Sequence, residues 1–143
     1  MQSIFEFTPN LIGILGSSSL SDFKLKKKIE ILSKSNLSLI EVNDIFIIET
    51  YSPWVQLLQI EQEKIFKLLN AKNVEIGFLN DIIVAPKKGI QSPWASKVSD
   101  IFSKCGIEIK NIEKVKRYRF SEQDSLEDLD LSLLYDPLVE SVI

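Results

Sequence analysis

The sequence predicts an α+β fold, in which two β-α-β halves form a mostly antiparallel sheet with helices on one face. Short apolar runs typical of strands alternate with stretches of helical periodicity, and the order of these elements recurs about 70 residues further along the chain. The chain has 143 residues, of which 45% are hydrophobic, so it has the size and apolar content of one compact domain. We therefore expect a single domain over residues 1–143.

The first half begins with Leu11–Leu15, a short apolar run before a turn of glycine and serines, which predicts a buried strand. Ser19 and Asp22 have the spacing of a capping box, so a helix is expected over about 20–35. Leu37–Thr50 is rich in β-branched and aromatic residues and predicts a long strand or a bent pair of strands. The apolar face of the helix would consist of Leu25, Ile29 and Leu32.

The second half repeats this order. Asp81–Pro86 predicts a second short buried strand, and Ser92 is a candidate N-cap with Pro93 at the first helical position. Gly106 should end that helix, and residues 107–120 predict another long strand. We expect Cys105 to be an inert buried thiol, because it falls in the helix's apolar stripe. That stripe consists of Trp94, Val98, Ile101, Phe102 and Cys105.

Two further helices lie outside the repeat. Apolar spacing predicts a connector helix over about 60–70 and a final helix from about residue 124, marked by Leu126, Leu129 and Leu133. The halves at about 11–50 and 81–120 should be related by a pseudo-twofold axis, since each alone is too small to bury its strands. A second Ser-Pro-Trp, at 52–54, has a different offset and is interpreted as a loop coincidence.

Composition restricts the chemistry that this chain can perform. It has no histidine, one cysteine and no Gly-rich phosphate loop, so we expect no catalytic, metal or cofactor-binding residues. No apolar run is long enough to span a bilayer, and the N-terminus lacks a basic segment of the kind that begins a signal peptide. A cytoplasmic protein that binds neither membrane nor nucleic acid is the prediction.

One loop could nevertheless bind an anion. Lys87, Lys88 and Gly89 lead into the helix that begins near Ser92, and Lys97 lies one turn inside it. Free backbone N–H groups at a helix N-terminus attract negative charge. The alternative, an ordinary helix terminus that binds nothing, is the more common case. Lys26–Lys28 could likewise bind phosphate groups, but we interpret them as a solvated helix face.

Several segments resemble the N-terminal domain of the large, single-chain phosphoribosylformylglycinamidine synthase, the glutamine-dependent ligase of purine biosynthesis. The resemblance covers nearly the whole chain, and Ile112 and Glu113 also match the family's pattern. The segments that carry it are Ile14–Leu32, Gly89, Ser92-Pro93-Trp94, Ser96-Lys97, Asp100-Ile101, Cys105-Gly106 and Leu134–Val142.

The resemblance implies a ferredoxin-like fold of the fused-dimer type and a non-catalytic role. The parent enzyme converts formylglycinamide ribonucleotide, glutamine and ATP into the amidine, and its ATP, Mg²⁺ and glutaminase sites lie in other domains. This chain would be a fragment of that enzyme that packs on the synthetase and glutaminase domains and helps to frame the ammonia path. The implied interface residues are Ser92, Trp94, Lys97 and Asp100.

Two other functions stay open at this point. Arg117 and Arg119 alternate with Tyr118 and Phe120, a pattern typical of strands on which nucleic-acid bases stack, although the chain's pI of about 5.1 argues against it. A stand-alone β-α-β module that binds a regulatory small molecule is the second alternative.

Overall fold

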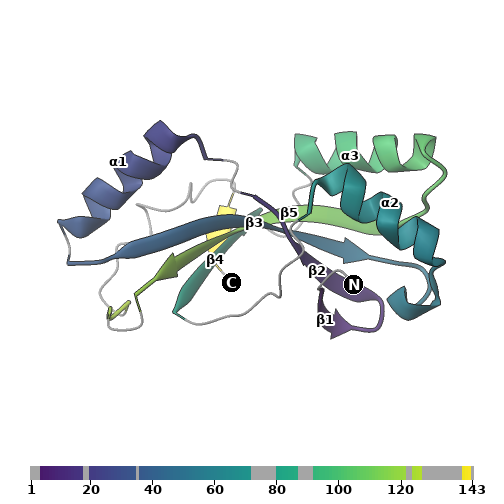
Figure 1. Cartoon of the computed structure of the whole chain (residues 1–143), viewed down its shortest axis with the longest axis horizontal. Helices are drawn as coiled ribbons and strands as arrows, with labels where there is room; N and C mark the ends of the chain where they lie inside the picture. Colours follow the sequence, from purple (N-terminus) through teal and green to yellow (C-terminus); the bar gives the residue numbers. More distant parts are fainter. Residues whose placement is uncertain are drawn as a thin grey trace. The chain divides into compact units, whose positions relative to one another are not determined.

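The structure, a computed structural model, describes residues 4–17, 20–34, 36–71, 80–86, 92–121, 124–126 and 140–142. Six strands form one sheet in the order β1-β2-β3-β5-β4-β6, and its ladders β1–β2, β2–β3, β4–β5 and β4–β6 are antiparallel, which confirms the α+β, ferredoxin-like fold (Figure 1). The elements are β1 (Phe5–Thr8), β2 (Leu11–Leu15), α1 (Asp22–Ser33), β3 (Leu39–Glu49), the 3-10 turn η1 (Trp54–Gln56), α2 (Gln59–Leu69), β4 (Asp81–Pro86), α3 (Pro93–Lys104), β5 (Asn111–Phe120) and β6 (Glu140–Val142).

The chain forms two compact units, and each is assembled from three separate segments. The first unit consists of Met1–Ser17, Ile45–Ile76 and Gln91–Lys114, and the second of Ser18–Asp44, Gly77–Ile90 and Val115–Ile143. The first unit therefore holds β2, α2 and α3, whereas α1, β4 and β6 belong to the second. The strands β3 and β5 each contribute residues to both units.

The strand pairing repeats along the chain with a constant offset. The ladder between β2 and β3 pairs Leu11 with Glu49, and the ladder between β4 and β5 pairs Asp81 with Arg119. Both members of the second pair are numbered 70 higher (81 against 11, 119 against 49), and the following pairs keep this offset. The repeat inferred from the sequence is thus present in the hydrogen-bond register. The pseudo-twofold relation between the two halves stays a prediction.

The helices α1 and α3 each have a serine as N-cap. Ser21 and Ser92 have extended backbone, with ψ of 158° and 150°, and their hydroxyls accept the backbone N–H of Lys24 and Ala95. The cap expected at Ser19 is therefore wrong, because Ser21 is the residue whose hydroxyl reaches an N–H of the first turn. Ser19 itself lies outside the described residues.

The two helix ends are also alike. Asn36 and Gly106 have positive φ angles of 59° and 78° and reverse the chain after α1 and α3. The backbone N–H of the next residue then donates to the carbonyl of a buried helical residue, as Ile107 does to Phe102 at 2.9 Å. This closing pattern satisfies a carbonyl that the helix leaves free.

An asparagine closes the open end of each strand pair. The Asn10 side-chain amide donates to the carbonyl of Tyr51 at 3.2 Å, and the Asn80 amide donates to the carbonyl of Ser121 at 2.8 Å. These pairs again differ by 70 in both numbers. Each asparagine precedes a short strand and fastens the chain that leaves the long strand beside it.

Each unit has its own apolar core, and its helices lie over one face of its strands (Figure 1). Trp54 is only 4% exposed and is part of the first core, so the Ser-Pro-Trp at 52–54 contributes a core residue and is more than a loop coincidence. The first core consists of Ile12, Ile14, Phe46, Ile48, Trp54, Ile65, Phe66, Leu69, Phe102, Ile107 and Ile112. The second consists of Leu32, Leu37, Leu39, Val42, Val84, Tyr118 and Phe120.

Two predicted positions are corrected by the structure. Cys105 is exposed rather than buried, because it caps α3 and its backbone turns away from the helical conformation, with φ of −86° and ψ of 4°. Ile29 is 38% exposed, and the half-buried residues of α1 are Leu25, which was expected, and Lys28, which was not. A lysine stem can cover apolar surface while its ammonium stays near water.

The C-terminal residues also differ from the prediction. Glu140–Val142 is the strand β6, which pairs with β4, so the helix expected there is wrong. Residues 124–126 are not helical, and most of the predicted final helix lies outside the described residues. The helix expected over about 60–70 is present as α2, Gln59–Leu69, and its role as a connector stays a prediction. No described helix combines the length and apolar character needed to cross a bilayer.

Candidate functional site

The N-terminus of α3 is fixed by a side chain from β5. The Ser92 hydroxyl accepts the N–H of Ala95 at 3.0 Å and donates to the Glu113 carboxylate at 2.8 Å. The same Glu113 oxygen accepts the N–H of Lys114 at 2.9 Å. The hydroxyl's only proton is therefore used within the domain, which makes Ser92 a positioning residue for the helix.

Trp94, two residues after Ser92, is half-buried against the first core. Its ring stacks on Phe46 with centroids 5.6 Å apart and planes inclined by 15°, and the Lys114 ammonium lies 5.1 Å from its centroid. A Cβ at Gly16 would collide with the Phe46 ring, so this position favours glycine. Phe46 is thereby held between the backbone at Gly16, directly after β2, and the Trp94 indole.

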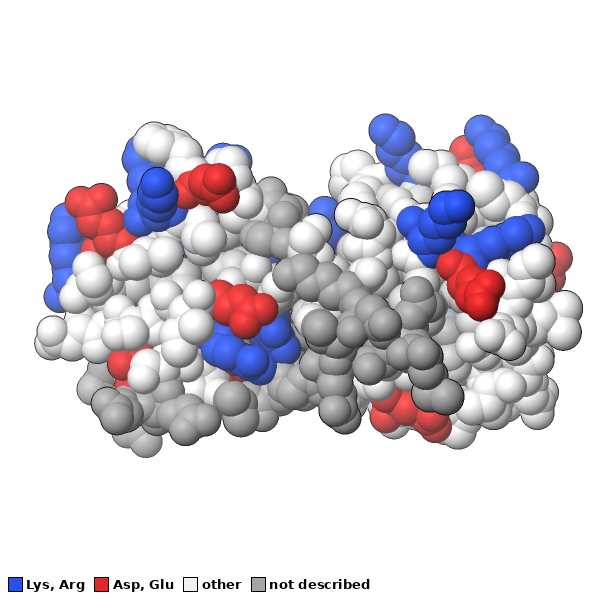
Figure 2. All heavy atoms as spheres, viewed as in Figure 1, with Lys and Arg blue, Asp and Glu red and all other residues white. Residues whose placement is uncertain are grey.

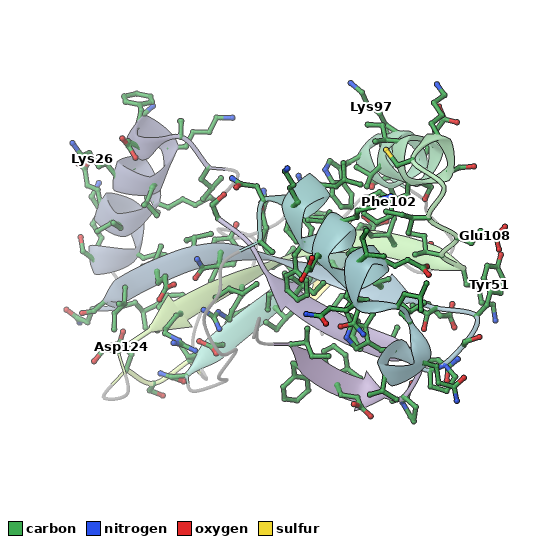
Figure 3. All side chains as sticks on the ribbon, turned by 45° about the vertical axis from the view of Figure 1, so that its right-hand side comes forward. Lys26, Tyr51, Lys97, Phe102, Glu108 and Asp124 are labelled. Carbon is green, nitrogen blue, oxygen red and sulfur yellow. The ribbon has the colours of Figure 1, made fainter. Side chains whose placement is uncertain are left out.

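An apolar groove of about 130 Å³ lies next to Trp94, between α2 and α3. Its two exposed members are Leu68 on α2 and Ile101 on α3, with 42% and 41% of their surface accessible. In Figure 3, Lys97 stands on the outer side of α3, whereas Phe102 points toward the strands. The groove is lined by Phe46, Leu68, Leu69, Trp94, Val98, Ile101 and Phe102.

The structure separates the four predicted interface residues into different environments. Ser92 and Trp94 are held by Glu113, Lys114 and Phe46, none of which the sequence pattern singles out for this part. Lys97 and Asp100 are exposed on α3, and Asp100 forms an ion pair with Lys104 at 3.2 Å. Of the four, only Trp94 lines the groove.

A second, wider groove lies where η1 leads into α2. It has a volume of about 840 Å³ and is shaped by Gln62, whose side-chain amide donates to the carbonyls of Trp54 and Leu57 at 3.1 and 3.4 Å. Val55, which lines this groove, is 75% exposed, and Leu58 and Ile60, which follow it within five residues of the chain, are 64% and 60% exposed. We call these three residues the apolar corner. The groove is lined by Ile4, Trp54, Val55, Leu57, Gln59, Gln62, Glu63 and Phe66.

The second unit has charged side chains in its interior. Arg119 binds both oxygens of Asp81, its strand partner, at 3.0 and 3.3 Å. The Arg117 side chain is 2% exposed, donates to Asn43 at 3.0 Å and lies 3.7 Å from Glu41. Burial, and then the charge of Arg119, lowers the pKa of Arg117, while the hydrogen bonds to Asp81 raise the pKa of Arg119.

This arrangement bears on the nucleic-acid hypothesis. Tyr118 and Phe120 are each 1% exposed, in the second core, so their rings offer no face on which a base could stack. Burial raises the pKa of Tyr118 to about 12, helped by Glu140 and Asp44. The alternation of cations and aromatics therefore reflects a strand with one face in an apolar core and the other in a polar network.

The other candidate sites offer no reactive constellation in the described part of the chain. Lys87, Lys88 and Gly89, expected to hold an anion, lie outside the described residues. Among the residues that the structure describes, no three His, Cys, Asp or Glu side chains gather as metal ligands.

The comparison with protein families agrees with the resemblance seen in the sequence. Residues 45–143, more than half of the chain, match the family described as formylglycinamide ribonucleotide amidotransferase N-terminal. The matched part contains the apolar corner, both helices of the narrow groove and the Ser92–Glu113 contact. The chain therefore belongs to the family of N-terminal domains of formylglycinamide ribonucleotide amidotransferase.

Proposed function

We propose that this chain is a non-catalytic assembly domain of that amidotransferase. It packs on the synthetase and glutaminase domains of the parent enzyme in the cytoplasm and helps to frame the path that ammonia takes between them. ATP, Mg²⁺ and the glutaminase nucleophile belong to the other domains. Purine biosynthesis is the pathway that this ligase serves.

The apolar corner is the observation that supports this role. Val55, Leu58 and Ile60 are large apolar side chains exposed within six residues of the chain, and Val55 lines an open groove. Neighbouring exposed apolar residues of this kind mark surfaces that another protein surface covers. A domain that belongs to a larger enzyme needs such a surface, and the other domains of the parent enzyme are the occupant to which we commit.

The test uses the complete enzyme with Val55, Leu58 and Ile60 all changed to serine. Product formation is measured with glutamine and, separately, with an ammonium salt as the nitrogen source. If the domain frames the ammonia path, the glutamine-supported rate should fall roughly tenfold relative to the ammonium-supported rate, a loss of about 1.4 kcal/mol. Glutamine hydrolysis should then continue without matching product.

A matched control changes Phe23 and Ile40, which are 67% and 63% exposed in the second unit, to serine. This control should leave the ratio of the two rates unchanged. If the corner variant also leaves both rates unchanged, the corner is not a docking surface. An equal fall of both rates would keep the docking role and remove the ammonia path from the proposal.

A further inference from the structure

The narrow groove between α2 and α3 has the features of a pocket for one side chain. The residues that line it are all aliphatic or aromatic, and its two lips, Leu68 and Ile101, are about two-fifths exposed although each lies next to core residues. An apolar cavity of about 150 Å³ holds a benzene molecule. At about 130 Å³, this groove therefore accommodates one large aliphatic or aromatic side chain.

The charges beside the lips are mainly positive. Lys64 lies one turn before Leu68 on α2, and Lys97 lies one turn before Ile101 on α3, so each lip has an exposed lysine at helical i, i+4 spacing. Lysine side chains stand out from both helices in Figure 2. The neighbouring carboxylate of Asp100 is already paired with Lys104 at 3.2 Å.

One carboxylate lies on the same side of α2. Glu61 is half-buried, three residues before Lys64 and seven before Leu68, so it reaches only the end of the groove. Because Glu61 is also at i, i+3 spacing from Lys64, it offsets part of that charge, and the described residues near the lips keep an excess of one positive charge, with Lys64, Lys97 and Lys104 against Glu61 and Asp100. A partner that buries an apolar side chain here brings its own neighbouring residues within reach of Lys64 and Lys97.

From this arrangement we propose the chemistry of the partner. The groove binds an acidic amphipathic segment of another domain of the parent enzyme, with one large apolar side chain in the pocket and carboxylates facing Lys64 and Lys97. Such a segment follows the helix-in-groove mode, in which a few apolar anchors provide affinity and charges provide specificity. The inference rests on the proposed assembly role but concerns a surface separate from the apolar corner.

Photo-crosslinking in the complete enzyme tests the proposal. A benzophenone amino acid replaces Leu68 or Ile101 in separate variants, and mass spectrometry identifies the peptide that becomes attached. We expect one peptide outside residues 1–143, with a large apolar residue flanked by aspartate or glutamate. Attachment to a second copy of this chain, to a segment without acidic residues, or to nothing would overturn the inference.

Two comparisons make the result specific. Changing Lys64 and Lys97 together to glutamate should lower the cross-link yield at Ile101 about fivefold or more, whereas Lys26→Glu, on α1 of the second unit, should not change it. A benzophenone at Leu58 reports on the apolar corner. If Leu58 attaches to another domain and the groove positions do not, the groove inference fails while the assembly role stands; if none attaches, both fail.

Discussion

Replacing Trp94 with alanine separates two roles that this side chain can have, as part of the core and as part of a docking surface. Trp94 is half-buried, stacks on Phe46 and has the Lys114 ammonium close to its ring. Trp54, in contrast, is 4% exposed. The two tryptophans of the chain therefore form an internal comparison of partial and full burial.

The expected cost follows from these contacts. Full burial makes a Trp→Ala change worth about 3–5 kcal/mol of unfolding free energy, which is the value we expect for Trp54. Trp94 loses an aromatic pair worth about 0.5–1.5 kcal/mol, a cation–π contact of about 0.5–1 kcal/mol, and the burial of part of its ring. We therefore expect about 2–3 kcal/mol for Trp94→Ala.

The assay is denaturant unfolding of the purified chain, followed by circular dichroism. A double-mutant cycle with Phe46→Leu isolates the stacking, and we expect a coupling energy of about 1 kcal/mol between the two positions. Val55→Ala is the control, because this side chain is 75% exposed and should cost less than about 0.5 kcal/mol.

Two results would refute this reasoning. If Trp94→Ala costs no more than the Val55→Ala control, the indole contributes nothing to the core and is only a docking residue. If the coupling to Phe46 is zero while the single change is costly, the stacked geometry does not carry the stability, and burial alone does.

Two further predictions concern stability. Burial, and then the negative charge of Glu140, raises the pKa of Tyr118 to about 12, so the stability that the neutral phenol provides is present below pH 10 and is lost as the pH rises toward 12, by about 2.7 kcal/mol of unfolding free energy. Tyr118→Phe should remove this pH dependence from unfolding measurements between pH 9 and pH 12. The lowered pKa of Lys28 adds a pH dependence of opposite sign, in the wild-type protein and in Tyr118→Phe alike. Gly16→Ala should cost about 1–3 kcal/mol, because the new methyl group must displace the Phe46 ring, and an unchanged denaturation midpoint would contradict it.

Local pattern was sufficient to predict most elements of this fold. The apolar run at Leu11–Leu15, the serine at position 92 and the glycine at position 106 act through neighbours within a few residues, so their roles could be read from spacing. The offset of 70 could be inferred for the same reason. Each half repeats its own local order.

The parts that were missed depend on contacts between distant residues. The strand β6 forms because its residues pair with β4, as Glu140 does with Pro86. No local sequence pattern predicts a pairing over this distance along the chain. β1 is likewise a short edge strand defined by its partner β2. In the candidate site, Ser92 and Glu113 are 21 residues apart, so the hydrogen bond between them could not be read from helix or strand periodicity.

The exposure of Cys105 was missed for a different reason. Helical periodicity places it in the apolar stripe of α3, but the helix ends at Lys104, and the periodicity no longer applies one residue later. The 70-residue offset aligns Cys105 with Ser35 in the polar run Lys34–Asn36 of the sequence, which could have indicated that the helix has already ended there. Repeats thus carry information on helix ends that a single helix pattern lacks.

The interleaved assembly of the two units also determines the order in which they can form during synthesis. The first unit needs Gln91–Lys114, so it stays incomplete after its second segment has ended at Ile76. At about 5–20 residues per second, a ribosome needs roughly 2–8 s to add the missing stretch. During that time the apolar side of α2 is not yet covered by α3. The second unit also lacks its last segment, Val115–Ile143. The first unit can be completed once Lys114 is made, whereas the second still lacks Val115–Ile143, so a nascent chain that pauses after Ile76 has neither unit complete and should be prone to aggregation and to chaperone binding.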